Sequence, residues 1–311
     1  MDFKQDVLHG LRNKLKALPS RYFYDAKGDA LFQRIMRLEE YYLPGCEKEI
    51  IENATENIAD ILYGRTSQWN VIELGAGDGS KTKALLKGFE QKGISVNYIP
   101  LDISSNVLQI NRDNILGELP GISYEGVAGN YFRTFHTVKR KFSHNLILYL
   151  GSNIGNYTNE RAVKFLQWLR KGMTDRDIAL IAFDLKKQPH TILKAYNDSQ
   201  GITRLFNLNL LERINRELNG DFIIDNFDHY PYYEPVSGTA YSYLVSLKDQ
   251  IVTIDGESFH FDKYELIHTE ISKKYDLTEI HTLSVAGGFD VKLHFHDRRK
   301  YYSLSIFTPH D

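Results

Sequence analysis

The sequence predicts an α/β protein with a doubly wound, mostly parallel sheet that is interrupted by an α+β insert. Between residues 70 and 184, short apolar strand patterns alternate with helical patterns, and this alternation is typical of βαβ units. Between residues 222 and 261 the pattern changes to an aromatic-rich alternation of period two, which is typical of a β-meander. The helix–strand pattern returns after Tyr275, so we expect the meander to belong to an insert.

The chain before Pro44 is expected to be helical. Helical spacing connects the apolar residues Phe3, Val7, Leu8, Leu11 and Leu15. Pro19 should end this first helix, because proline cannot continue a helix interior. Asp29 is the expected N-cap of a second helix.

Five strands and three helices are expected in the alternating block. The strands are 70–74, 98–103, 122–127, 145–150 and 178–184, and the helices are 81–92, 106–116 and 160–171. In the insert, a helix at 204–218 precedes the meander, and Asp255-Gly256 predicts a hairpin turn. A last helix at 278–286 and two antiparallel closing strands at 291–296 and 301–307 complete the prediction.

Composition excludes several classes of protein. A hydrophobic fraction of 42 % and a net charge of −2 in 311 residues are typical of a soluble globular protein without a basic nucleic-acid surface. No apolar run is long enough to span a bilayer, and the first twenty residues lack the apolar stretch of a signal peptide. The single cysteine, Cys46, forbids an internal disulfide. We therefore expect a cytoplasmic protein with no nucleic-acid or membrane partner. We further expect a monomer with a small-molecule substrate.

A glycine-rich turn follows the first strand of the alternating block. In Val71–Thr82, an apolar strand leads into Gly75, Gly77 and Gly79 and then into a helix, as in the nucleotide sites of doubly wound sheets. Asp102 ends the next strand, where a carboxylate can accept hydrogen bonds from ribose hydroxyls. S-adenosylmethionine and a dinucleotide both fit this pattern. Because Ser80 replaces the third glycine of the dinucleotide fingerprint, the spacing favours S-adenosylmethionine.

The turn after the fourth strand is polar but uncharged. Gly151–Tyr157 contains Ser152, Asn153 and Asn156, which can hydrogen-bond an amine or a carboxylate without placing a charge beside a sulfonium. The same residue types also form turns and cap helices, and composition alone favours that second interpretation.

Six blocks of sequence carry a resemblance to a known family. They are Arg21–Asp25, Gly28–Phe32, Arg37–Tyr42, Ile72–Gly77, Leu150–Asn156 and Ala195–Asp198. In this order, and over nearly the whole chain, they resemble the histidine-specific S-adenosylmethionine-dependent methyltransferases. Those enzymes trimethylate the α-amine of histidine to hercynine, the first step towards ergothioneine. The blocks outside the glycine turn make the resemblance specific, because many methyltransferases share that turn.

The resemblance implies two domains and a set of cofactor contacts. A class I methyltransferase core with a Rossmann-like sheet would comprise residues 46–184 and 277–311, and a substrate domain would comprise residues 1–45 and 185–276. The residues implied to bind S-adenosylmethionine are Gly75, Gly77, Lys81, Asp102, Asn130 and Tyr131. The family usually has aspartate at the position of Asn130, and an asparagine oxygen can still accept from the adenine amine.

The resemblance also implies substrate and catalytic residues. Tyr41, Asn156 and Tyr196 would hold the amino-acid end of the substrate, and Tyr24 would lie near the amine. Of these, Tyr24, Tyr41 and Asn156 would position the amine for an in-line displacement. Glu270 and Ser272 would bind the imidazole, and their spacing agrees, because residues i and i+2 of a strand point to the same face.

One departure from the family pattern concerns substrate identity. Where the family usually has Pro-Thr-Arg after its tyrosine pair, this chain has Leu43–Cys46 without a basic residue. Relatives in the family methylate a prenylated tryptophan, so another amine is an alternative substrate. A catalytically idle nucleotide-binding protein is a second alternative.

His294 and His296 share a strand face, but they lack further ligands at metal-binding spacing, and we expect no metal site.

Overall fold

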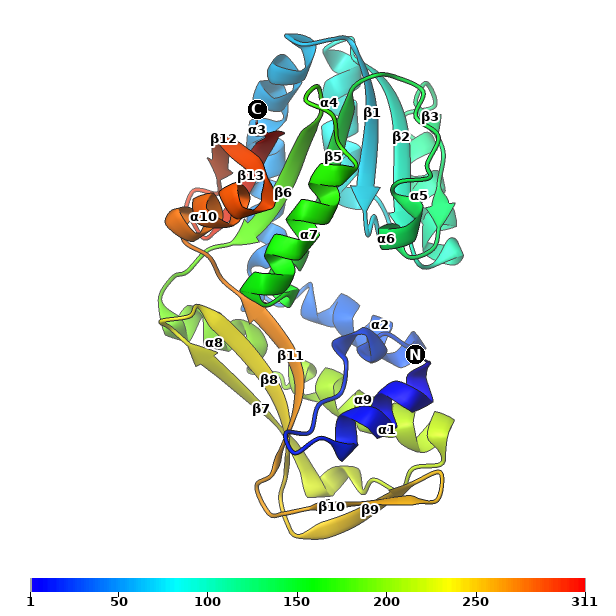
Figure 1. The fold of residues 1–311 in the computed structure, drawn as a ribbon, viewed down its shortest axis with the longest axis vertical. Helices are drawn as coiled ribbons and strands as arrows, with labels where there is room; N and C mark the ends of the chain where they lie inside the picture. Colours follow the sequence, from blue (N-terminus) through cyan, green and yellow to red (C-terminus); the bar gives the residue numbers. More distant parts are fainter. Residues whose placement is uncertain (1, 311) are drawn as a thin grey trace. The chain divides into compact units, whose positions relative to one another are not determined.

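The computed structural model describes residues 2–310 and divides the chain into two compact units (Figure 1). The α/β unit comprises Leu43–Leu185 and the chain from Tyr275 onward. The α+β unit comprises the chain up to Tyr42 and the segment Lys186–Lys274. The domain boundaries expected from sequence lie one to three residues from these positions.

The α/β unit is built on one eight-stranded sheet. The strand order is β12-β13-β6-β5-β1-β2-β3, and β4 also pairs with β2. All pairs are parallel except those of β13, which runs antiparallel to β12 and β6. The predicted doubly wound α/β class is therefore confirmed. The strands are β1 (Gln68–Leu74), β2 (Ser95–Asp102), β3 (Ser123–Tyr124), β4 (Val127–Ala128), β5 (Asn145–Tyr149), β6 (Ile178–Asp184), β12 (Phe289–His296) and β13 (Tyr302–Pro309).

Helices cover both faces of this sheet. Helix α3 packs on α4, and α4 packs on α5, whereas α7 packs on α10 against the other face (Figure 1). Side-chain alternation in β1 explains the two layers: Ile72 and Leu74 join the core that contains Phe165 of α7, while Glu73 between them bonds to Thr82 of α4. The helices are α3 (Leu43–Tyr63), α4 (Ser80–Gln91), α5 (Ser105–Leu116), α6 (Tyr131–Thr134), α7 (Asn159–Lys171) and α10 (Leu277–Gly287), with the 3₁₀ turn η2 (Asn153–Asn156).

The α+β unit packs helices on an antiparallel sheet of order β11-β8-β7, beside a separate hairpin of β9 and β10. The hairpin turn is Asp255-Gly256, and both residues have positive φ, as a two-residue turn of this kind requires. The strands are β7 (Phe227–Glu234), β8 (Thr239–Ser246), β9 (Gln250–Ile254), β10 (Glu257–Phe261) and β11 (Leu266–Lys273). The helices are α1 (Phe3–Arg12), α2 (Ala26–Ile35), α8 (Pro189–Tyr196) and α9 (Ile202–Leu218), with η1 (Ser20–Phe23) and η3 (Ile224–Asn226).

Three local expectations are wrong. The first helix ends at Arg12, well before Pro19. The N-cap of α2 is Asp25, whose side chain accepts from the Gly28 amide, and Asp29 lies in the first turn instead. The strand expected at 122–127 is two pairs of residues, β3 and β4, because the chain leaves the sheet between them.

Candidate active site

The glycine turn between β1 and α4 forms an open cradle. Gly75 and Gly77 have φ of +72° and +55°, a conformation that side chains rarely adopt. A Cβ atom on either residue would meet nothing within 4 Å, so the space in front of this backbone is free. Gly79 is needed for a different reason, because its Cβ would lie 2.8 Å from Nδ2 of Asn111. The turn can therefore receive a ligand on its main chain.

Asp102 closes one side of this cradle. It ends β2, next to β1 in the sheet, and its Oδ2 accepts from the Gly77 amide at 3.1 Å. Its Oδ1 accepts from the Ser104 amide at 3.0 Å. These bonds fix the carboxylate beside the glycine turn and leave it lone pairs for further donors. The structure thus brings together the predicted cofactor residues Gly75, Gly77 and Asp102.

Lys81, another predicted cofactor residue, is held by a buried carboxylate of α3. Its Nζ lies 2.6 Å from Oε2 of Glu47, which is 1 % exposed. Burial has the largest single effect and disfavours the ammonium form of Lys81. The charge and hydrogen bond of Glu47, together with the charges of Glu73 and Asp78, outweigh it, so the pKa of Lys81 is raised. The other oxygen of Glu47 accepts from the Gly151 amide at 2.6 Å and from the Tyr302 hydroxyl at 2.9 Å. One carboxylate therefore ties the segment after β1 to the turn after β5.

The turn after β5 has a constrained backbone. Gly151 and Ser152 both have positive φ, and Oγ of Ser152 accepts from the Asp184 amide at 2.8 Å. The 3₁₀ turn that follows ends at Asn156, whose side chain is exposed. Because β5 lies next to β1 where the strand order changes direction, this turn lies at the edge of the sheet where doubly wound proteins bind ligands.

Asn130 and Tyr131, the predicted adenine contacts, begin the short helix α6. Asn130 is exposed and caps α6, with Oδ1 accepting from the Phe132 amide at 2.9 Å. The Tyr131 hydroxyl lies 3.0 Å from that of Tyr157. The centroid of the Phe132 ring lies 4.8 Å from that of Trp168 on α7, with the rings tilted by 57°, and this contact packs α6 against α7.

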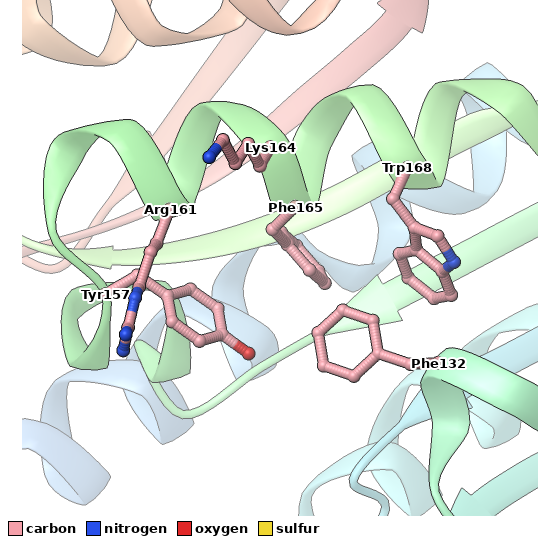
Figure 2. Close-up of a pocket in the computed structure, with 6 residues that line it drawn as sticks. All are labelled: Phe132, Tyr157, Arg161, Lys164, Phe165 and Trp168. Carbon is pink, nitrogen blue, oxygen red and sulfur yellow. The ribbon is translucent and has the colours of Figure 1, made fainter.

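A pocket of about 280 Å³ lies beside these rings (Figure 2). None of the predicted site residues lines it. Its lining residues are Phe132, Tyr157, Arg161, Lys164, Phe165 and Trp168.

Four predicted substrate residues gather in the α+β unit around aromatic rings. Tyr24 packs edge-on against Phe32, Phe32 against Tyr41, and Tyr41 against Tyr196, with centroids 5.5, 6.4 and 6.3 Å apart. Although Tyr24 is 44 % exposed, desolvation raises the pKa of its hydroxyl well above the ordinary value, and the charge of Glu270 raises it further. Glu270 therefore acts on the same cluster.

Glu270 and Ser272 lie on β11 immediately after a β-bulge. In the pairing with β8, His268 faces Tyr243 and Glu270 faces Ser242, so Thr269 is the extra residue. The Thr269 hydroxyl is buried and donates to the backbone oxygen of Ser242 at 2.9 Å. The bulge changes the direction in which the side chains after it point. Burial raises the pKa of Glu270 to about 7 despite the opposing charge of Lys274.

Lys274 and Tyr196 both reach Ser272. Nζ of Lys274 donates to Oγ of Ser272 at 2.9 Å and to the Tyr196 hydroxyl at 2.7 Å. The Tyr196 hydroxyl donates to Oγ of Ser272 at 2.8 Å. Tyr196, which the resemblance assigns to the amino-acid end of the substrate, is thus in direct contact with a residue that it assigns to the imidazole.

Two aspartates in the sequence blocks that carry the family resemblance fix the backbone next to Tyr24 and Tyr196. Asp25 follows Tyr24 and accepts from Nδ2 of Asn209 in α9 at 2.8 Å. Asp198 lies two residues after Tyr196 and accepts from the amides of Ile202 and Thr203, which begin α9. These carboxylates fix the backbone beside two predicted substrate residues, which explains their place in the blocks.

Sequence reasoning missed Glu47, Thr269 and Lys274. Glu47 stands among charged residues of a helix that was not expected, and only its burial reveals its role. Thr269 and Lys274 flank the residues that were singled out, so the signal was their proximity to Glu270 and Ser272.

The fold and the glycine cradle together define the class of this protein. An open cradle at the carboxyl end of β1, with a carboxylate at the end of β2, fits the methionine and ribose parts of S-adenosylmethionine. The chain is an S-adenosylmethionine-dependent methyltransferase of the doubly wound class. Within that class, residues 3–309 match the family model described as "Histidine-specific methyltransferase, SAM-dependent", and the chain belongs to this family.

Relatives within the family carry different names. The chain is 32 % identical over 274 residues to the histidine N-alpha-methyltransferase of Mycobacterium tuberculosis, covering 88 % of this chain and 84 % of the relative. It is 30 % identical to ergothioneine biosynthesis protein 1 of Schizosaccharomyces pombe, over 94 % of this chain and 39 % of that longer protein. It is 28 % identical to a 4-dimethylallyltryptophan N-methyltransferase of Claviceps fusiformis, over 62 % of this chain and 56 % of the relative.

Residues 2–310 lack two other kinds of feature. No helix in this range is long and apolar enough to cross a membrane. Within the same range, His, Cys, Asp and Glu side chains nowhere gather in threes that could hold a metal ion.

Proposed function

We propose that the chain transfers methyl groups from S-adenosylmethionine to the α-amino nitrogen of L-histidine, up to the trimethylated product hercynine. The observation that carries this proposal is the pair of Glu270 and Ser272 on one face of β11. A carboxylate accepts an imidazole N–H, and a hydroxyl can serve the second ring nitrogen. The identity to the histidine N-alpha-methyltransferase of M. tuberculosis supports the same substrate.

The α/β unit is proposed to hold the methyl donor. S-adenosylmethionine, when bound, supplies a methyl group on a positively charged sulfur. The cradle of Gly75 and Gly77 would receive the methionine part, with Lys81 near its carboxylate, and Asp102 would accept from the ribose hydroxyls. Asn130 and Tyr131 would contact the adenine. Lys81 is the one cation among these contacts, and its ion pair with Glu47 offsets that charge.

The α+β unit is proposed to hold the amine. Attack on a methyl carbon needs a neutral amine aligned with the bond that breaks. Tyr24 and Tyr41 would orient the nitrogen by hydrogen bonds, and the raised pKa of Tyr24 keeps its hydroxyl protonated at neutral pH. It therefore positions the amine and does not act as an ionised base. Aromatic rings around it tolerate the growing ammonium group.

A tryptophan-derived amine is the second candidate substrate. The relative named 4-dimethylallyltryptophan N-methyltransferase favours it, and so does the absence of a basic residue in Leu43–Cys46. We further propose that the protein works as a monomer in the cytoplasm. The single, buried cysteine, Cys46, supports the reducing compartment.

Mass spectrometry of reaction products tests the function. Purified protein is incubated with S-adenosylmethionine and either L-histidine or L-tryptophan. We expect one to three added methyl groups on histidine, and a loss of at least about tenfold in kcat/KM in Glu270→Ala, because a hydrogen-bonding partner of the imidazole is removed. Glu257→Gln, an exposed carboxylate of β10 paired with Arg12, is the matched control and should retain full activity. Methylation of tryptophan but not of histidine would overturn the proposed substrate.

A further inference from the structure

Lys274 places a positive charge in the interior of the α+β unit. The residue is 0 % exposed, and burying an ammonium group is costly unless it is well bonded. Its Nζ donates to the hydroxyls of Tyr196 and Ser272 at 2.7 and 2.9 Å and lies 4.7 Å from the centroid of the Tyr196 ring. The ammonium group therefore donates to two residues of the proposed substrate site.

The hydrogens of this group can be assigned. A lysine ammonium only donates hydrogen bonds, and a tyrosine hydroxyl has one hydrogen. The Tyr196 hydroxyl directs its hydrogen to Oγ of Ser272. Oγ of Ser272 thus receives two hydrogens, one from Lys274 and one from Tyr196, which occupies both of its lone pairs. The hydrogen of Ser272 itself has to point to a third partner, so this serine can only donate.

Glu270 has the complementary polarity. It lies two residues before Ser272 on the same face of β11, after the bulge at Thr269. As a carboxylate it can only accept. An acceptor and a donor at this spacing match a neutral imidazole, which has one N–H and one bare nitrogen. An imidazolium ion has two N–H groups, one of which would face the hydrogen of Ser272. An indole lacks the bare nitrogen.

We propose that Lys274 is a positioning residue that fixes the Ser272 hydroxyl as a donor, so that the pair of Glu270 and Ser272 selects a neutral imidazole over an imidazolium ion and over an indole. This inference rests on the proposed function. On this inference, tryptophan is disfavoured because its indole has no bare nitrogen to accept the hydrogen of Ser272. Mismatches of this kind give large specificity ratios.

The pH dependence of binding tests the inference. The ligand is imidazolepropionate, a histidine analogue without the α-amine, and its affinity is measured by calorimetry between pH 6 and 8. The charges that act on this cluster belong to Glu270, Lys274, Tyr24, Tyr41, Tyr196 and Asp29. The ligand ring and Glu270 both titrate in this range. On β11 and β7, burial lowers the pKa of His268, and it lowers that of His229 to about 4.

The two recognition modes give different pH profiles. If a carboxylate and a neutral ring are both required, affinity rises roughly 40-fold from pH 6 to 8, given a pKa of about 7 for Glu270 and of about 6.5 for the ring. If an imidazolium were bound instead, the same values give a bell-shaped profile that varies only about fivefold and peaks just below pH 7. We expect the rising profile for the wild-type protein, and the bell-shaped profile would overturn the inference.

Two lysine variants locate the effect. Lys274→Met frees the Ser272 hydroxyl to accept, so the preference for histidine over tryptophan should fall. The variant also removes the charge that lowers the pKa of Glu270, so the pH profile should change as well. Lys273→Met is the matched control, since Lys273 is also buried but donates to the backbone oxygen of Ser237 at 2.7 Å. It should keep the wild-type profile.

A folded Lys274→Met protein with the wild-type profile and preference would overturn the inference. Should Lys274→Met fail to fold, the pH profile of imidazolepropionate binding to the wild-type protein tests the inference by itself. Absence of both imidazolepropionate binding and histidine methylation would instead overturn the proposed function, and the inference with it.

Discussion

At the scale of single residues, Glu270 lowers the free energy of unfolding at neutral and higher pH. Its folded pKa of about 7 lies above the ordinary value of 4.5, so between these values the folded state holds a proton that the unfolded state has lost. Stability therefore falls as pH rises through this window, and the loss persists above pH 7. Functional sites commonly hold groups that are strained in this way.

Glu270→Gln should remove that cost. We expect the variant to be more stable than the wild type at pH 8 by on the order of 1–3 kcal/mol, and about equally stable at pH 4.5. Urea unfolding at the two pH values measures the difference. Equal stability of the two proteins at pH 8 would show that Glu270 is ionised without penalty.

Some residues of the candidate site could be singled out from the sequence and others could not. Glu270 and Ser272 could be found because a family motif and strand periodicity agreed on them. Lys274 could not, since two adjacent lysines usually indicate a solvated strand end, and only burial distinguishes Lys274 from that case.

At the scale of elements, α3 contributes the carboxylate that joins two turns of the candidate site. Glu47 accepts from Gly151 in the turn after β5 and pairs with Lys81 in the first turn of α4. Both segments flank the glycine cradle. A shift of about 1 Å in such supports can cost a reaction on the order of a hundredfold.

Glu47→Gln is expected to raise KM for S-adenosylmethionine at least about tenfold, because the charge that holds Lys81 is lost. Asp177→Asn is the matched control. Asp177 is equally buried at the other end of β5, where it accepts from the amides of Asn145 and Thr174 at 2.9 and 2.7 Å. It should lower the melting temperature without changing KM. Equal effects of both variants on KM would show that Glu47 has only a general structural role.

Elements with clean periodicity were predicted to within a few residues, and the failures have physical reasons. The long helix α3 was missed because Pro44 and Gly45 suggest a turn, although proline is well tolerated in a first helical turn. The bulge at Thr269 could not be predicted, because a change of strand register does not alter the alternation of side chains in so short a sequence. The strand at 122–127 was over-extended because its apolar residues are also compatible with the loop that separates β3 from β4.

At the scale of the whole molecule, the two units are proposed to bind different ligands. Hydrogen exchange with mass spectrometry can map this division, since a ligand protects the amides that it orders. S-adenosylhomocysteine should slow exchange around residues 71–82 and 102–104, and imidazolepropionate should slow it around residues 266–274. Protection of the α+β unit alone by S-adenosylhomocysteine would contradict the assignment.

The architecture at this scale was predictable because the alternation of strands and helices is regular from Gln68 to Asp184 and changes abruptly in the insert. The helices before Tyr42 belong to the same unit as the insert. Composition and periodicity do not reveal such a long-range partnership, which here came from the family resemblance.

The split of the α+β unit has a consequence for the order in which the chain is made. Val7, Leu11 and Leu31 pack in one core with Phe206 and Leu210. The second segment of the unit begins at Lys186, 144 residues after Tyr42 (186 − 42). At roughly 5–20 residues per second, a ribosome needs about 7–30 s to cover that interval. For this time the apolar faces of the first helices lack their partners from the second segment, while the intervening strands of the other unit emerge.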